Sequence, residues 1–186
     1  LADVLEKHNE LIPVIQRFGI NLGFGDKSIV ELCNEHQINT SFFLDIINTF
    51  INKAYFPREK MQAYSIQTLI DYLRSTHTYY LHTVLPAIED DIAALSESCR
   101  RRCENMHFIH TFYQNYKDEL LQHIHNEEHK FFPFALALAH MQEQTADLKS
   151  LHKQYGFSYS AHIREHEEVI VKLTDLKIIL IKYVPP

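Results

Sequence analysis

The chain has 186 residues, of which 46% are hydrophobic, and a net charge of −6. This length suits one ordinary domain or two small ones, and the acidic balance argues against a nucleic-acid partner. We find no apolar run long enough to span a bilayer and no signal peptide, so a membrane partner is not expected. Three cysteines (Cys33, Cys99 and Cys103) make no disulfide framework, which favours a cytoplasmic location.

Residues 1–57 are predicted to form a small helical domain. Apolar residues at helical spacing predict an opening helix. The stretch 18–28 holds three of the four glycines, and it predicts a turn because glycine permits positive φ. A further helix is expected over 29–36, and Thr40 or Ser41 is expected to cap the next one.

Residues 61–186 predict an all-α, up-down bundle of long helices. One apolar stripe at helical spacing covers 66–85. Residues 87–132 contain neither proline nor glycine, yet one unbroken helix of that length would exceed a domain of this size. The polar stretch 96–105 is therefore the expected turn. Ser160 is expected to cap the last helix.

His123 and Glu127 are four residues apart, so they share one helical face. The same face carries an apolar line made of Ile109, Tyr113, Tyr116, Leu120 and Phe131. An imidazole and a carboxylate that point into a packed interior each need a partner there. A metal ion such as iron, manganese or zinc would satisfy both.

Histidine is unusually frequent, and eleven of the thirteen histidines fall between positions 77 and 166. Three helices are expected to bring such residues to one level of a bundle. The predicted metal ligands are His77, His123, Glu127 and His166. Further candidates are His107, His110 and His162. His125 and His129 lie on another face beside a lysine, and a surface location is expected for both.

Several motifs follow one another in an order that resembles a known family. They are the glycine-rich Phe18–Lys27, Thr76-His77, Leu85-Pro86, His123-x-x-x-Glu127-Glu128-x-x-Phe131-Phe132-Pro133 and Glu165-His166-Glu167. In this order the chain resembles the iron-sulfur cluster repair proteins. That family consists of di-iron proteins with a hemerythrin-like bundle behind a small N-terminal domain. The likeness spans nearly the whole chain.

The resemblance implies a non-haem di-iron centre that takes a small ligand such as O2 or NO. His77, His123, Glu127 and His166 match the positions of iron ligands, with Glu127 between two metals. The implied function is repair of damaged iron-sulfur clusters, or a response to nitric oxide and oxidative stress.

Three departures from the family pattern stand out. Gly23 and Phe24 occupy the places of two adjacent cysteines, so thiol chemistry assigned to that pair is lost. Cys99 stands at the distance where the family has another histidine, and His107 and His110 lie closer, so either the helix boundary has shifted or one ligand is missing. The fourth helix of the bundle, with its own His-x-x-x-Glu, is missing from this sequence, and we expect that the chain is incomplete. A partner subunit in a homodimer could instead fill the open groove.

Because the thiol pair is absent, a binding or sensing role is favoured over enzymatic turnover. One alternative is an input module that reports O2, NO or iron to an output domain of a larger signalling or transcription-regulating protein. Another alternative is a helical scaffold without metal.

Overall fold

The computed structural model describes residues 1–98, 106–141 and 148–183. Across these ranges the regular structure is helical and no strand occurs, which confirms the all-α prediction. Within the same ranges, no helix is both long and apolar enough to cross a membrane.

The chain forms two compact units, Leu1–Thr76 and His77–Pro186. The sequence had suggested a division between residues 57 and 61. In the structure the division falls later, within the helix α6 (Ile66–Tyr79), and most of α6 belongs to the first unit. Tyr72 explains the difference, because its ring stacks on Phe18 at a centroid distance of 4.8 Å. The first turns of that helix therefore share the aromatic packing of the N-terminal unit.

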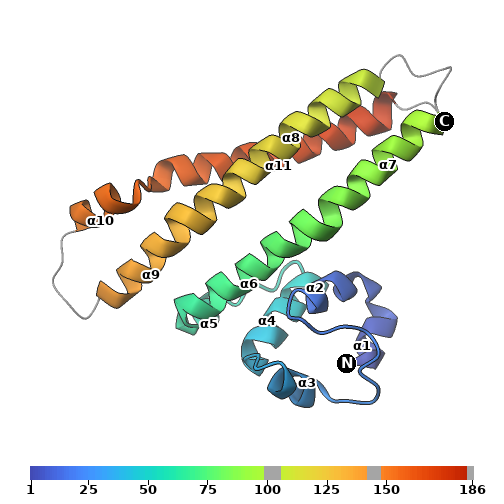
Figure 1. Cartoon of the computed structure of the whole chain (residues 1–186). Coiled ribbons are helices and arrows are strands. Elements are labelled where there is room, and N and C mark those ends of the chain that lie inside the picture. Colours follow the sequence, from blue (N-terminus) through green and yellow to red (C-terminus); the bar gives the residue numbers. More distant parts are fainter. Residues whose placement is uncertain (99–105, 142–147, 184–186) are drawn as a thin grey trace. The chain divides into compact units, whose positions relative to one another are not determined.

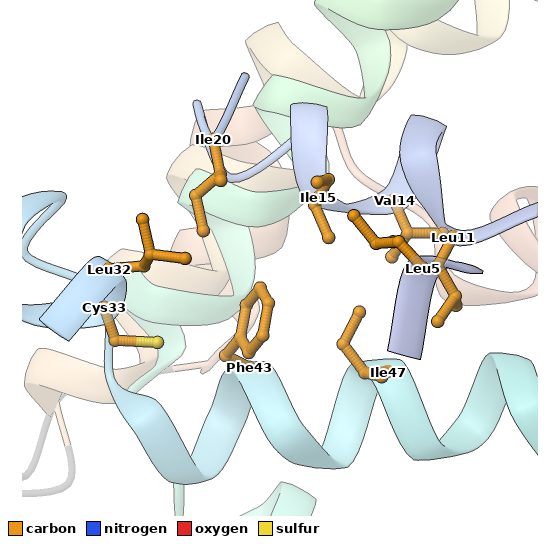
Figure 2. Close-up of a cluster of buried hydrophobic side chains, with 9 residues drawn as sticks. All are labelled: Leu5, Leu11, Val14, Ile15, Ile20, Leu32, Cys33, Phe43 and Ile47. Atoms are coloured by element: carbon orange, nitrogen blue, oxygen red, sulfur yellow. The ribbon is translucent and has the colours of Figure 1, made fainter. Parts of the chain in front are cut away.

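The first unit is a cluster of short helices around one apolar core. Its elements are α1 (Ala2–Lys7), η1 (Asn9–Leu11), α2 (Ile12–Gln16), α3 (Ile29–Glu35), α4 (Thr40–Ile51), α5 (Arg58–Ala63) and the first turns of α6 (Ile66–Tyr79). Figure 2 shows side chains of the early helices meeting Phe43 and Ile47 of α4. The predicted turn before α3 is present, and Gly19, Gly23 and Gly25 all have positive φ there.

In two helices of this unit, α3 and α4, a side chain at the N-terminus accepts a hydrogen bond from a backbone N–H of the first turn. Ser28 forms a reciprocal capping box with the third residue of α3. For α4 the cap is Asn39, whose side chain accepts a backbone N–H at 3.0 Å. The expectation of Thr40 or Ser41 was wrong, because Asn39 keeps the extended backbone that a cap needs (φ −65°, ψ 113°).

A buried carboxylate, Asp45, joins α4 to the segment that follows it. Tyr55 donates to one oxygen at 2.6 Å, and Tyr64 donates to the other at 2.7 Å. Lys60 lies 3.4 Å from the first oxygen. Burial alone would raise the pKa of Asp45, but these partners outweigh burial and lower it.

The second unit is built from long helical rods. Its elements are η2 (Tyr80–Val84), α7 (Leu85–Ser98), α8 (Met106–Asn126), η3 (Glu127–Phe131), α9 (Phe132–Met141), α10 (Leu148–Tyr155) and α11 (Tyr159–Tyr183). Both η2 and η3 are single π-helical turns inside otherwise α-helical rods. In Figure 1 the successive rods of this unit run in opposite directions, and α11 packs along α8.

The core of the second unit lies between α7 and α8. Leu85 and Ile92 of α7 pack against Ile109 and Tyr113 of α8, all with exposed fractions of 5% or less. The Tyr113 hydroxyl donates to the backbone carbonyl of Leu85 at 3.0 Å. Apolar burial and this buried hydrogen bond therefore both help to hold the two rods together.

Two expected features of the second unit have different outcomes. The turn at 96–105 falls largely outside the described residues. α11 begins at Tyr159, so Ser160 is inside the helix and the expectation that it caps was wrong. The likeness of the rods to a hemerythrin bundle stays a prediction.

Candidate metal centre

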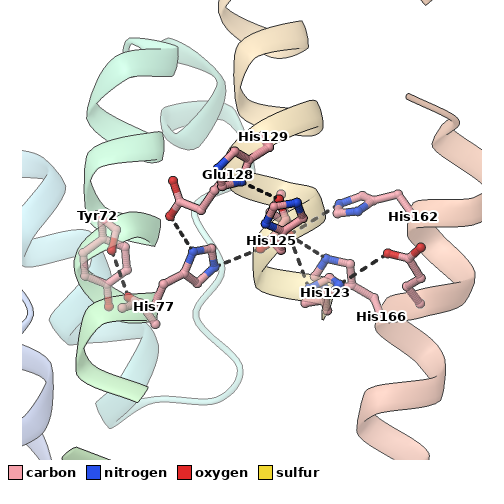
Figure 3. A network of polar contacts seen from close by, with 11 residues as sticks. Tyr72, His77, His123, His125, Glu128, His129, His162 and His166 are labelled. Atoms are coloured by element: carbon pink, nitrogen blue, oxygen red, sulfur yellow. Dashed lines mark hydrogen bonds and ion pairs between the residues drawn. The ribbon is translucent and has the colours of Figure 1, made fainter. Parts of the chain in front are cut away.

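The centre of the site is Glu127, the first residue of η3, whose side chain is only 7% exposed. One carboxylate oxygen, Oε1, faces three imidazoles. The Nε2 atoms of His123, His162 and His166 lie 3.5, 3.6 and 3.0 Å from it. Figure 3 shows these three rings gathered from the α8 rod and α11.

The other oxygen of Glu127 faces a different imidazole. Oε2 lies 2.9 Å from Nε2 of His77. The second nitrogen of that ring, Nδ1, lies 2.8 Å from Oε1 of Glu128. The His77 ring also stacks almost parallel on Phe132, with centroids 5.6 Å apart and 7° between the planes. Glu127 thus has three imidazoles on one oxygen and one on the other.

Helical period explains how the sequence delivers these side chains. His123 precedes Glu127 by four residues, and His162 precedes His166 by four, so each pair shares a face of its own rod. α11 packs along α8, which brings the two faces together. π-helical turns occur often at functional sites, and here one begins at the central glutamate.

Burial and charge act in opposite directions on the ionisable groups. Burial lowers the pKa values of His123 and His162, which favours their neutral, metal-binding form. Burial would raise the pKa of Glu127, but the hydrogen bond from His77 and the neighbouring imidazoles outweigh it and lower that pKa. Burial would likewise lower the pKa of His77, yet the two glutamates that face it raise it.

These donors fit a transition-metal ion. His123, Glu127, His162 and His166 each offer one ligand atom, and all four atoms lie within 4.8 Å of one another. Imidazole nitrogen together with carboxylate oxygen suits iron, zinc and manganese. Nδ1 of His123 is buried and has no hydrogen-bond partner among the described residues, although Glu165 lies 3.6 Å away. His166 is half exposed, so the cluster has a side that solvent reaches.

The four residues predicted as ligands all come into this network. His162, given only as a further candidate, lies in it as well. His107 and His110 do not: both are exposed, and His110 pairs with Ser96 at 2.8 Å. Cys99, at the place of the family's additional histidine, lies outside the described residues. The ligand set itself stays a prediction.

His125 and His129, the two histidines that flank Glu127 on the α8–η3 rod, lie on its exposed face. His125 and His129 are exposed, and their rings stack at a centroid distance of 4.1 Å. Nδ1 of His129 lies 3.0 Å from the backbone carbonyl of His125.

Sequence reasoning missed the contact that Glu128 makes with His77. Its position beside Glu127 in the motif was the available signal.

Comparisons of the chain with protein-family models, with curated proteins and with solved structures yield no match. The resemblance to the cluster repair proteins therefore stays a prediction.

Proposed function

We propose that the second unit holds a pair of non-haem iron ions around Glu127. The observation that carries this proposal is the two-sided use of one buried carboxylate. His123, His162, His166 and Oε1 would hold one ion, and His77 with Oε2 would hold the other. A carboxylate with a different set of imidazoles on each oxygen is suited to lie between two cations.

Iron is favoured over zinc on the basis of the proposed role. Iron in such a site supplies reversible binding of O2 or NO and one-electron redox chemistry, whereas zinc has no redox chemistry. The half-exposed His166 leaves an approach for a small ligand. The proposed role is a response to nitric oxide or oxidative stress, or repair of iron-sulfur clusters, in the cytoplasm.

Binding or sensing is favoured over thiol-based turnover. The two places that hold cysteines in the resembling family are Gly23 and Phe24 here. Gly23 has φ +97°, a conformation in which any side chain would be strained. The turn is therefore shaped for glycine, and any repair activity of this chain would proceed without that thiol pair.

A metal-free scaffold is the second candidate, and one observation favours it. His77 has a carboxylate at each ring nitrogen, and Glu127 has imidazoles at both oxygens. Buried polar groups that satisfy one another can be retained for structure alone. Metal analysis separates the two candidates.

The test is iron loading of the full chain under anaerobic conditions, followed by elemental analysis. We expect His123→Ala and Glu127→Ala to lose tight iron binding. His125→Ala and His129→Ala are matched controls from the exposed face of the same rod, and they should load as the unsubstituted chain does. Circular dichroism would verify that each variant is folded. Equal loading of all four variants, or no loading of the unsubstituted chain, would refute the proposal.

A further inference from the structure

Two consecutive glutamates hold the two nitrogens of a single imidazole. Nε2 of His77 lies 2.9 Å from Glu127, and Nδ1 lies 2.8 Å from Glu128. An ionised carboxylate only accepts hydrogen bonds, so Nδ1 of His77 is the donor to Glu128. Figure 3 shows Glu128 reaching from the η3 rod toward His77.

Local backbone geometry makes this double contact unusual. Neighbouring side chains on an α-helix diverge by about 100°, because there are 3.6 residues per turn. Glu127 and Glu128 nevertheless meet the same ring, and both belong to the π-helical turn η3. That turn is followed by Phe132, whose ring lies parallel to His77 and limits its tilt. Three side chains from one short segment thus set the orientation of one imidazole.

We infer that Glu128 is a positioning residue for metal binding, an inference that rests on the proposed function. By accepting Nδ1–H, its carboxylate keeps Nε2 of His77 directed at Oε2 of Glu127. A histidine ligand commonly donates its remaining N–H to a carboxylate, which fixes the ring and makes the ligating nitrogen more basic. Glu128 therefore has an indirect role, and it is not itself a ligand.

The asymmetry of the cluster makes this role selective. Among the residues that the structure describes, three imidazoles face the Oε1 side of Glu127, whereas His77 alone faces the Oε2 side. Loss of Glu128 should lower the affinity for the ion on the His77 side and leave the affinity for the ion on the three-histidine side unchanged. A general loss of folding stability would instead lower the affinity for both ions.

The test compares Glu128→Ala and Glu128→Gln with the control Glu119→Ala, which removes a glutamate of α8 that pairs with Lys172 instead. Fe(II) is titrated anaerobically into the full chain, and both binding steps are measured. In Glu128→Ala the second step should weaken by about 10- to 100-fold. The first step should not change. The amide oxygen of Glu128→Gln can still accept Nδ1–H, so this variant should recover part of the loss.

A second measurement does not depend on iron. Imidazole nitrogen resonances of the metal-free, isotope-labelled chain report, for each nitrogen of His77, whether it carries a proton and a hydrogen bond. We expect Glu128→Ala to shift the Nδ1 resonance and Glu119→Ala to leave it in place. Unchanged second-step affinity together with an unchanged Nδ1 resonance in Glu128→Ala would overturn the inference. If the unsubstituted chain bound no iron, the proposed function would fail, and the resonance alone would still decide whether Glu128 orients His77.

Discussion

Iron binding should stabilise the second unit, and the gain follows from the ratio of free metal to its Kd. The candidate ligands of the ion on the Oε1 side come from two rods, since His123 and Glu127 lie on the α8–η3 rod and His162 and His166 on α11. An ion held by both rods binds the folded state and has no comparable site in the unfolded chain. Free metal at 100 times its Kd would then add about 2.7 kcal/mol to the free energy of unfolding.

For a unit of this size, such a gain raises Tm by roughly 10 °C. The assay is thermal unfolding of the full chain by far-UV circular dichroism, with and without Fe(II) under anaerobic conditions. Hydrogen exchange of α11 provides a local readout, because an ion that ties α11 to α8 should slow its opening.

Glu127→Ala removes the oxygens that face all four imidazoles, so its Tm should not respond to iron. His129→Ala leaves the cluster intact and should retain the full shift. An equal iron-dependent shift in Glu127→Ala and in the unsubstituted chain would show that iron binds elsewhere. The reasoning from ligand geometry would then be refuted.

Further predictions concern stability. Phe132 is fully buried and stacks on His77, so Phe132→Ala should cost about 3–5 kcal/mol in urea unfolding through the cavity that it leaves; a cost below 1 kcal/mol would contradict this packing. Ser28→Ala removes half of a capping box and should cost about 0.5–2 kcal/mol, whereas Ser28→Asp should restore most of it in the same experiment. The pKa of Asp45 is lowered from 3.8, so its stabilising contribution should be complete above that pH and disappear as the pH falls through the lower folded-state value. Burial and the Asp45 contact raise the pKa of Tyr64 from 10 to about 12, so its contribution should be complete below pH 10 and be lost between pH 10 and 12. Unfolding free energies measured across pH should lose the Asp45 dependence in Asp45→Asn and show a smaller Tyr64 dependence, because the burial of Tyr64 remains; an unaltered pH profile in that variant would contradict the assignment.

Parts of the fold and of the site were predictable from local pattern alone. The glycines of 18–28 predicted a turn, and the structure has three positive-φ glycines there. The four-residue spacing of His123 and Glu127 predicted a common face, since the helical period decides which residues of one helix lie together. Caps were less predictable, because Asn39, Thr40 and Ser41 are all chemically suited and the backbone conformation decides among them.

Other features depend on how separate helices meet. The spacing of His162 and His166 left open which of them faces inward, and packing of α11 on α8 brings both to Glu127. The two-sided contacts of Glu127 and the contact of Glu128 with His77 join atoms of separate rods, and residue spacing within one rod does not specify which atoms meet.

The sequence by itself thus determined an all-helical chain and the placement of histidines and a glutamate on particular helix faces. Only the tertiary structure decided which faces meet, at what level, and through which atoms. The physical reason is that helical period relates residues of one rod to one another, whereas the rotation and offset between rods are determined by the packing of side chains such as Leu85 and Tyr113 in the core.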